Sequence, residues 1–572
     1  MSRLIALKET SSRADLAALL GYTPKSFAYV LYKIPEQAKY NNFEIPKKGG
    51  GTRLIKAPIA QLKTLQRRLA KLLSSCRAEL DLAHKRPVLS HGFRKKYSIV
   101  TNARNHKGRR YVLNLDLADF FPSINFGRVR GLFIKHNDFK LNVDVATVIA
   151  QIACHDHSLP QGSPCSPIIS DLATRFLDVR LMQLAKKHRC TYSRYADDIT
   201  FSTNQKNFPS ALASQAGSFE GPWSLSQQLV SKISDAGFST NPKKTRMQCR
   251  TSRQVVTGLT VNVKANIGAV YYRRARAMSH SLFTTGAYRH AKAVIVAGSA
   301  PLTSEIIQKT ETKLDVLDGT LNHIYYVKNL ADYRDSVLKK SNPIAARKLY
   351  RRFLFFKHFV ALQKPLIVCE GKTDNIYIRS AVKSLSGSYP KLISESTFQF
   401  NLFRYSSIAD EVLRLGGGTG AFKILLPEYK KNIAAFKFSP LAHPVMLLID
   451  NDAGAKSVFN VVKENFSVEV GLDTTEDFYH LHKNLYLIKT PELDPKGISY
   501  IESFFDKVWL EKEIDGKKFN LGKKHEAPGE FGKFWFAEKI VMPNAAQIDF
   551  SKFGRLLSRV VAVIEHYSQL NK

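Results

Sequence analysis

The distribution of charge along the chain most constrains how it can be organised. Residues 1–364 carry 59 Lys and Arg against 23 Asp and Glu, whereas residues 365–572 carry 27 against 25. A net charge of +36 on the first part is typical of a surface that holds a polyanion such as nucleic acid. A chain of 572 residues also exceeds what one hydrophobic core organises. The sequence therefore predicts two to four domains, with a boundary near residues 360–365.

The N-terminus and the cysteines indicate the cellular compartment. The first 20 residues carry a charge every few positions and lack the apolar core of a signal peptide. No stretch approaches the roughly 18 apolar residues that a membrane-spanning helix needs. The six cysteines are scattered singly, without a CxxC pair or His partners at zinc-finger spacing. We expect a cytoplasmic protein with reduced thiols and no membrane partner.

Hydrophobic periodicity predicts several elements of the first part. Residues 61–73 place Leu at every third or fourth position, as in an amphipathic helix, and residues 167–187 predict a second helix with an early Pro. Residues 111–117 (YVLNLDL) predict a strand, and residues 190–202 (CTYSRYADDITFS) predict a hairpin with two aspartates near its turn. Four side chains are expected on one face of the second helix: Ile169, Leu172, Phe176 and Val179.

Adjacent carboxylates at the tip of this hairpin point to metal chemistry. Asp197 and Asp198 raise each other's pKa unless cations lie between them. Asp116, at the end of the apolar strand, is the natural third ligand of a two-metal site. Such a site activates a 3′-hydroxyl and steadies the departing pyrophosphate.

These residues belong to a larger set of motifs that resembles the reverse transcriptase family. The set occurs in the order found in that family: TRLIKAP (52–58), NLDLADFFPSI (114–124), LPQGSPCSPIIS (159–170), YADD (195–198), STNPKKT (239–245) and VTGLTVN (256–262). The resemblance implies a multidomain α/β protein with a right-hand polymerase fold. Fingers and a palm with an antiparallel sheet would occupy residues 1–270, and a helical thumb and connection residues 271–364. It also implies that Asp116, Asp197 and Asp198 bind two Mg²⁺ ions.

Further positions match family residues that surround the incoming dNTP. Phe121 matches the residue under the sugar, where its ring would collide with a 2′-hydroxyl. Gln161 matches a residue beside the nucleotide, and Arg53 resembles the fingers residue that holds the triphosphate. Lys243 or Lys244 would supply a cation or a proton to the pyrophosphate; spacing leaves both open.

Two short motifs resemble the retron branch of the family. NARNH (102–106) is similar to its NAxxH motif, and residues 256–258 are similar to its VTG motif. The resemblance implies RNA-binding roles for five residues: Asn102, His106, Val256, Thr257 and Gly258. It also implies a bacterial enzyme that binds a structured noncoding RNA and starts DNA synthesis from a guanosine 2′-hydroxyl within it.

The product of such an enzyme is branched, RNA-linked single-stranded DNA (msDNA). Residues 1–364 contain no candidate for an RNase H carboxylate cluster, so a host RNase H would trim the template. The alternative is a group II intron-like or other bacterial reverse transcriptase with an accessory domain. An oligomer is compatible with the sequence.

The last part of the chain predicts a second carboxylate site. LIVCEGKTD (366–374) is an apolar strand that delivers Glu370 to its carboxyl end, and PVMLLIDNDAG (444–454) delivers Asp450 and Asp452 in the same way. In open α/β sheets active sites form at this edge. Strand alternation would send both aspartates to one side, where with Glu370 they could bind one or two Mg²⁺ ions.

EGxxD followed about 80 residues later by DxD resembles a TOPRIM domain, and later runs are similar to the OLD-type nucleases of that superfamily. The resemblance covers most of residues 365–545. It implies a TOPRIM nuclease domain over 365–572, fused as an antiphage effector. Lys489 and Glu502 are candidate phosphate-binding and metal residues, with structural roles equally open. A glycine run at 416–420 is a turn or a phosphate cradle. The alternative for the whole domain is a catalytically silent nucleic-acid-binding scaffold.

Overall fold

The computed structural model describes residues 2–47, 51–215, 222–295, 304–492, 497–520 and 529–571. The fold is mixed α/β and divides into two compact units. The first comprises residues 1–272, 290–309 and 326–333, and the second comprises 273–289, 310–325 and 334–572. The segment 271–364, predicted as a thumb and connection, is therefore shared between the two units.

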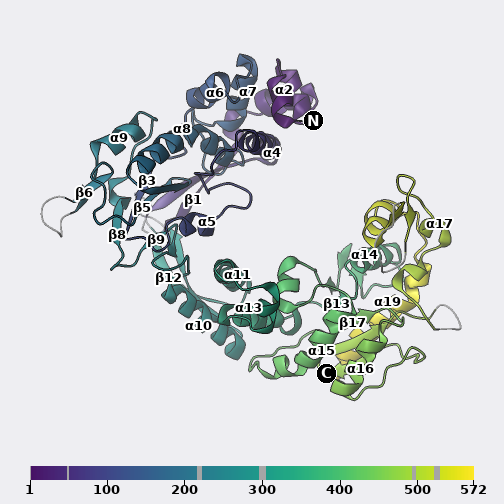
Figure 1. The fold of residues 1–572 in the computed structure, drawn as a ribbon. Coiled ribbons are helices and arrows are strands. Elements are labelled where there is room, and N and C mark those ends of the chain that lie inside the picture. The colour runs from purple at the N-terminus through teal and green to yellow at the C-terminus, as the bar shows by residue number, and fades with distance from the viewer. Residues whose placement is uncertain are drawn as a thin grey trace. The chain divides into compact units, whose positions relative to one another are not determined.

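A four-stranded antiparallel sheet organises the first unit, with strand order β4-β5-β3-β8. Figure 1 labels its strands β3, β5 and β8. Its strands are β3 (Tyr111–Asp116), β4 (Thr191–Tyr195), β5 (Asp198–Thr203) and β8 (Arg246–Cys249). The predicted strand and hairpin are thus confirmed, and so is an antiparallel sheet beneath the paired aspartates.

Helices and small hairpins complete the first unit. The helices are α1 (Arg3–Lys8), α2 (Arg13–Leu19), α3 (Pro24–Ala28), α4 (Ala60–Ala83), α5 (Ile99–Arg104), α6 (Phe126–Lys135), α7 (Val143–Ala153), α8 (Ser166–Lys187) and α9 (Gln227–Ser234). The hairpins pair β1 (Tyr40–Pro46) with β2 (Thr52–Pro58), β6 (Ala213–Gln215) with β7 (Trp223–Leu225), and β9 (Val255–Val256) with β10 (Leu259–Thr260).

The two predicted helices differ in how well their burial follows the sequence. In α4 the leucine stripe is buried as expected and joins the main core of this unit. In α8, Ile169 and Leu172 are buried, but Phe176 is 53% exposed, so the single stripe predicted for this helix is wrong at that position. The Phe176 ring instead lies beside the guanidinium of Arg180.

A five-stranded sheet organises the second unit, with strand order β16-β13-β17-β19-β18. Its strands β13 and β17 are labelled in Figure 1. Its strands are β13 (Leu366–Cys369), β16 (Asn401–Leu402), β17 (Val445–Ile449), β18 (Tyr479–His482) and β19 (Leu485–Lys489). All neighbours are parallel except β18, which pairs antiparallel with β19. The three central strands are buried along their whole length, as the unbroken apolar sequences of parallel strands predict.

Helices of the second unit include α12 (Ser336–Ser341), α13 (Ala345–Phe355), α14 (Asp374–Ser384), α15 (Thr419–Ala434), α16 (Lys456–Phe466), α17 (Lys507–Leu510), α18 (Lys533–Trp535) and α19 (Gly554–Leu570). The elements α10 (Ala269–Thr285), α11 (Asp315–Leu330), β11 (Tyr288–Ile295) and β12 (Ser304–Glu311) contain the points where the chain passes from one unit to the other. Within the described ranges, no helix is both long and apolar enough to span a bilayer.

Candidate active sites

Strand register brings three aspartates of the first unit together. Asp116, the last residue of β3, is the direct cross-strand partner of Asp198, the first residue of β5. Asp197 lies in the tight turn before Asp198, and its carbonyl accepts a hydrogen bond from Leu117 N at 3.0 Å. Ala196 takes a left-handed conformation (φ 56°), which lets the hairpin turn in two residues. The turn and the strand end therefore place all three carboxylates at one edge of the sheet.

The electrostatics of this edge are those of crowded negative charge. Burial, Asp197 and Asp116 raise the pKa of Asp198 to about 6. Burial and Asp116 also raise the pKa of Asp197, whereas Lys244 lowers it. Lys244 Nζ donates to Asp116 Oδ1 at 2.9 Å. Of the two lysines left open by the sequence, the structure thus brings Lys244 to the carboxylates.

Within the described part of the chain, no three His, Cys, Asp or Glu side chains are gathered closely enough to hold a metal ion. The donor set at the sheet edge nevertheless fits Mg²⁺, because carboxylate oxygens are its preferred protein ligands. Mutual repulsion among Asp116, Asp197 and Asp198 would also be relieved by added positive charge.

A buried arginine, which the sequence analysis did not identify, supports this turn. Arg194 donates from Nε and one terminal nitrogen to the two oxygens of Asp178, both at 2.7 Å, and from the other terminal nitrogen to the carbonyl of Ala196 at 2.9 Å. Asp171 lies 3.4 Å from Arg194 and pairs with Arg77 at 2.7 Å. The YADD turn is therefore held from inside the unit by a buried ion-pair network.

Strand β2 and the PQG segment form the neighbouring part of the site. Lys56 N donates to the carbonyl of Gln161 at 2.8 Å. Gly162 has φ 125°, and a Cβ there would lie 2.5 Å from the carbonyl oxygen of Lys56, so glycine is required. Arg53, on the same strand, is exposed, and its charge lowers the pKa of Asp197. Gln161 is thus joined through its backbone to the strand that carries Arg53, and the charge of Arg53 acts on Asp197.

Phe121 is half-buried and lies within a short row of aromatic rings, between Phe120 and Phe93. Its ring centroid lies 5.3 Å from that of Phe120 and 6.2 Å from that of Phe93. These contacts restrict the ring while leaving part of it exposed. Such a ring can act as a rigid steric barrier.

The residues of the NARNH motif are located differently from the expectation of direct RNA contact. Asn102 and His106 are fully buried. Ser193 Oγ donates to Asn102 Oδ1 at 2.7 Å, and the two ring nitrogens of His106 each lie 2.7 Å from a hydroxyl, of Ser193 and of Ser202. Both side chains are enclosed, and their hydrogen bonds join α5 and the residues just after it to β4 and β5.

Residues 256–258 form the turn of the β9–β10 hairpin. Val256 and Leu259 are cross-strand partners, so Thr257 and Gly258 are the two turn residues, with φ of 46° and 83°. Positive φ at both positions is the mark of a type I′ turn. Thr257 Oγ1 donates to the carbonyl of Ile99 at 3.2 Å. The VTG hairpin therefore packs on α5, the helix that carries Asn102, and only Gly258 of its three residues is exposed.

The second unit collects carboxylates at the carboxyl ends of β13 and β17. Glu370 follows β13, Asp374 begins α14, and Asp450 follows β17. Burial, then Asp374, Glu502 and Glu370, raise the pKa of Asp450 to about 8. Burial and Glu502 raise the pKa of Asp374 to about 6. Asp374 was not among the predicted site residues, although it is the last residue of the EGxxD pattern.

Asp452 has a different environment from the one expected. Strand β17 ends at Ile449, so strand alternation does not extend to Asp450 and Asp452. Asp452 Oδ1 accepts hydrogen bonds from Gly454 N at 2.8 Å and Ala455 N at 3.2 Å, at the start of α16. Asp450 Oδ1 instead accepts from Ile501 N at 3.0 Å, beside Glu502.

Two lysines of this unit have distinct environments. Lys533 Nζ donates to the buried Glu502 at 2.9 Å and carries the positive charge of the carboxylate cluster. Lys489 is fully buried and donates to the carbonyls of Gly471 and Thr474, both at 2.6 Å. The phosphate-binding role considered for Lys489 is therefore not supported by its geometry, because backbone carbonyls occupy its donors.

The glycine run at 416–420 lies against the first of these carboxylate residues. Gly418 N donates to the carbonyl of Glu370 at 2.8 Å, and a Cβ on Gly417 would lie 3.4 Å from the same oxygen. Gly417 and Gly418 have φ of 99° and 81°. The glycines allow a close backbone approach that fixes the turn after β13.

Comparisons with known proteins place the first unit in context. Residues 45–268 match the family described as "Reverse transcriptase (RNA-dependent DNA polymerase)". The chain is 36% identical to the Retron Mx65 reverse transcriptase of Myxococcus xanthus over 46% of its own length and 62% of that protein. It is 32% identical to the Retron Mx162 reverse transcriptase of the same organism, over 46% and 55%. It is 34% identical to the Retron Ec86 reverse transcriptase of Escherichia coli, over 43% and 70%. The aligned region therefore spans less than two thirds of the two Myxococcus relatives.

Proposed function

The chain belongs to the retron reverse transcriptase family, and on that premise we propose that its first unit copies RNA into DNA at the edge formed by Asp116, Asp197 and Asp198. The observation that carries this proposal is the cross-strand pairing of Asp116 with Asp198, with Asp197 in the adjoining turn. Three crowded carboxylates and one lysine are suited to bind divalent cations and a phosphate-bearing substrate.

The residues around this edge have distinct roles in the proposed reaction. Mg²⁺ held by the three carboxylates would supply the positive charge that favours attack by the primer hydroxyl and loss of pyrophosphate. Lys244, already at Asp116, presents an ammonium to the leaving phosphates. Arg53 provides a guanidinium for the triphosphate. The Phe121 ring excludes a ribose 2′-hydroxyl, so that dNTPs are selected.

We further propose that the template and primer is a structured noncoding RNA and that the product is branched, RNA-linked single-stranded DNA. Two features support this: the NARNH and VTG motifs lie together in the fold, and residues 1–364 carry a net charge of +36. A host RNase H would trim the template, in the cytoplasm of a bacterium. The buried NARNH residues would then act by fixing a surface on which RNA binds, whereas Gly258 is exposed at the tip of the hairpin.

A second proposed function concerns the C-terminal carboxylates. Glu370, Asp374, Asp450 and Glu502 act on one another's charge at the edge of a parallel sheet, where TOPRIM-like sites form. We propose a Mg²⁺-dependent nuclease, held inactive by the retained RNA–DNA product and released when phage infection disturbs that product. Carboxylate chemistry fits Mg²⁺ here also, and Lys533 supplies the positive charge that the cluster requires.

The polymerase proposal is tested by Asp197→Asn in the full-length protein. DNA synthesis on the co-purified RNA should fall below about one per cent of the parent, because a ligand for the catalytic cations is removed, while RNA binding stays within about twofold. Asp235→Asn, at the exposed end of α9, is the matched control and should keep full activity. Full-rate synthesis by Asp197→Asn would overturn the site. Sequencing the bound nucleic acid separates the retron proposal from a group II intron-like enzyme.

The nuclease proposal is tested by the double variant Glu370→Gln with Asp450→Asn. It should still make the DNA product but should neither cleave nucleic acid in Mg²⁺ nor arrest growth when that product is degraded in the cell. Glu469→Gln, whose side chain is 79% exposed and pairs with exposed Lys463, is the control. Equal growth arrest by parent and double variant would make the C-terminal unit a scaffold without nuclease activity.

A further inference from the structure

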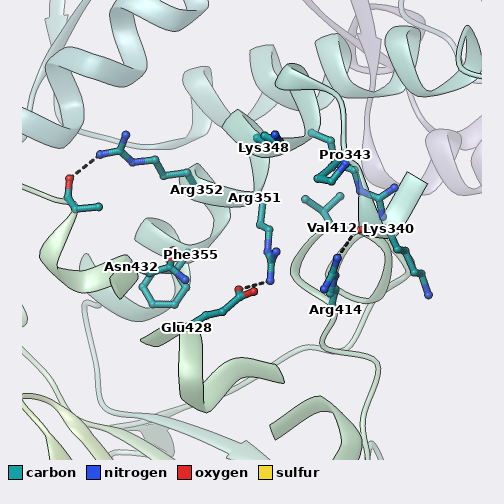
Figure 2. Close-up of a pocket in the computed structure, with 12 residues that line it drawn as sticks. Lys340, Pro343, Lys348, Arg351, Arg352, Phe355, Val412, Arg414, Glu428 and Asn432 are labelled. Carbon is teal, nitrogen blue, oxygen red and sulfur yellow. Dashed lines mark hydrogen bonds and ion pairs between the residues drawn. The ribbon is translucent and has the colours of Figure 1, made fainter. Parts of the chain in front are cut away.

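A basic pocket in the second unit lies outside both carboxylate sites. It has a volume of about 390 Å³ and is lined by residues of α12, α13 and α15 and by the segment around Arg414. Figure 2 shows Arg351 extending from α13 toward Glu428 on α15, with Arg414 reaching toward Lys340 on the other side. We call it the α13 pocket, because α13 contributes five of its lining residues.

Positive charge dominates the lining of the α13 pocket. Glu428 is its single carboxylate, against six cationic side chains: Lys340, Arg347, Lys348, Arg351, Arg352 and Arg414. Five of these six cations lie between residues 340 and 352, within the strongly basic first 364 residues of the chain. A cavity so lined is a strong anion-attracting environment, because its walls focus the field of the cations.

The protein's own groups leave this charge largely uncompensated. Arg347, Arg352 and Arg414 donate to backbone carbonyls, of Glu411, Ala435 and Lys340 respectively, and such neutral partners do not cancel a charge. Arg351 pairs with Glu428.

The crowding of like charges also affects the pKa of Arg351. Burial lowers the pKa of Arg351, and nearby Arg414 and Arg347 lower it further against the opposing effect of Glu428. A bound anion would relieve this repulsion.

The protein holds cations of the α13 pocket in fixed positions. Arg347 is only 7% exposed, although arginine is rarely so enclosed. Arg414 has a left-handed backbone (φ 61°), an unfavourable conformation for a residue other than glycine. Strain of this kind is commonly retained at ligand sites.

From this geometry we propose that the α13 pocket binds a nucleotide phosphate. The volume falls in the range of small-ligand sites and accommodates one nucleotide rather than a length of strand. Arg351 and Arg414 face the cavity from opposite walls and would bind the phosphate oxygens. Val412 and Phe355 give the cavity an apolar wall for the base, and the Asn432 amide offers a donor and an acceptor to its edge.

The ligand has two possible sources, a free mononucleotide or the terminal nucleotide of a DNA strand. Both present the same phosphate and base to the pocket. The proposal is independent of the polymerase and nuclease functions, because none of the lining residues belongs to either carboxylate site.

The test is calorimetric titration of the full-length protein, freed of nucleic acid, in EDTA so that neither carboxylate site can bind phosphate through a metal ion. The probes are deoxyadenosine 5′-monophosphate, deoxyadenosine, and a 5′-phosphorylated tetradeoxynucleotide. The parent should bind the monophosphate at least tenfold more tightly than the nucleoside. The double variant Arg351→Gln with Arg414→Gln should weaken monophosphate binding at least tenfold. Lys423→Gln, exposed on α15 outside the pocket, should change it less than twofold.

Glu428→Gln provides a test in the opposite direction. Removing the single carboxylate of the pocket should tighten monophosphate binding at least threefold, a gain that damage to the fold would not produce. Tighter binding of the tetranucleotide than of the monophosphate would identify a strand end as the source, and equal binding a free nucleotide. The proposal is overturned if the parent binds no phosphate-bearing probe, if the arginine double variant binds as the parent does, or if Glu428→Gln gives no gain.

Discussion

Arg194 and Asp178 form a two-point ion pair, with both Arg194 Nε and a terminal nitrogen 2.7 Å from an Asp178 oxygen, and both side chains almost completely buried. The remaining terminal nitrogen of Arg194 holds the carbonyl of Ala196. The residue immediately before Asp197 is thus anchored to α8, and the position of the turn that carries Asp197 depends on a buried ion pair.

Arg194→Lys should therefore reduce both stability and turnover. A lysine keeps the charge but cannot reach Asp178 at two points and Ala196 at once. We expect a loss of about 1–3 kcal/mol in the free energy of unfolding. We also expect a fall in kcat larger than any change in KM for dNTP, since the turn proposed to hold Mg²⁺ would move while the proposed nucleotide contacts remain. Denaturant titration and steady-state synthesis measure these, with Arg180→Lys, on the partly exposed face of α8, as control. Parent-like kcat in the folded variant would contradict the assignment.

Substitutions of the two adjacent lysines, Lys243 and Lys244, should have very different effects on the polymerisation rate. Lys244→Met removes the ammonium that lies 2.9 Å from Asp116 and should lower the polymerisation rate about 10²-fold or more, the usual size of a lost proton donor or cation. Lys243→Met, the neighbouring residue in the same short 3-10 helix, should change the rate by less than about threefold. Single-turnover incorporation of one dNTP measures both rates. Equal losses for the two variants would contradict the assignment of Lys244 rather than Lys243 to the site.

Sugar selection should depend on Phe121. Phe121→Ala removes the ring expected to collide with a 2′-hydroxyl, so rNTP incorporation should rise relative to dNTP incorporation by at least about tenfold, equivalent to roughly 1.4 kcal/mol. Phe93→Ala removes a neighbouring ring of the same row and controls for loss of packing. Primer extension with mixed nucleotides measures the ratio, and an unchanged preference in Phe121→Ala would exclude this residue as the gate.

His106 should make stability depend on pH. Burial lowers the pKa of His106 to about 3, from an ordinary value near 6.5. The neutral ring is thus favoured in the folded state, so its contribution is fully present above about pH 6.5 and is lost as the pH falls toward 3. His106→Ala should lose about 1–3 kcal/mol at pH 7 and unfold with a shallower pH dependence in acid. Exposed His84→Ala should leave the unfolding curve unchanged. A parent-like acid profile for His106→Ala would contradict this.

Asp450 should make stability depend on pH in the opposite direction. Its pKa is raised to about 8, so the folded state favours the protonated acid and stability falls as the pH rises from about 4 to 8. Asp450→Asn cannot ionise and retains an oxygen for Ile501 N. At pH 8.5 without Mg²⁺ it should stabilise the protein by more than about 1 kcal/mol while abolishing cleavage. Asp452→Asn, which only weakens the start of α16, should not stabilise. Thermal unfolding across pH distinguishes the two variants.

Local sequence patterns predicted the elements that carry the first site. The alternation in residues 190–202 and the apolar run in residues 111–117 give β3, β4 and β5 almost residue for residue. The motif spacing then predicted which carboxylates would meet, and the register of β3 and β5 pairs Asp116 with Asp198. These features depend on the alternation of apolar residues within short segments and on one hairpin. Both can be recognised directly in the sequence.

Long-range contacts were not predictable in the same way. The partners of His106 are Ser193 and Ser202, which lie 87 and 96 residues away, so the motif itself gave no sign that its side chains would be buried. The sequence around Arg194 is that of an ordinary basic residue in a strand, and it does not indicate that Asp178 of α8 is its partner. Asp374 was present in the EGxxD pattern, and its position at the start of a helix after a buried strand was the signal that could have identified it.

The requirement for glycine at position 162 bears on how the polymerase would handle each nucleotide. Its missing Cβ lets the PQG segment lie directly on the backbone of β2, and the hydrogen bond from Lys56 N to Gln161 O joins them. Arg53 and Gln161, proposed to hold the triphosphate and the nucleotide, are thereby coupled through backbone rather than through flexible side chains. Any opening or closing of β2 during the synthetic cycle would carry the PQG segment with it. Nucleotide entry and nucleotide alignment would then be a single concerted motion.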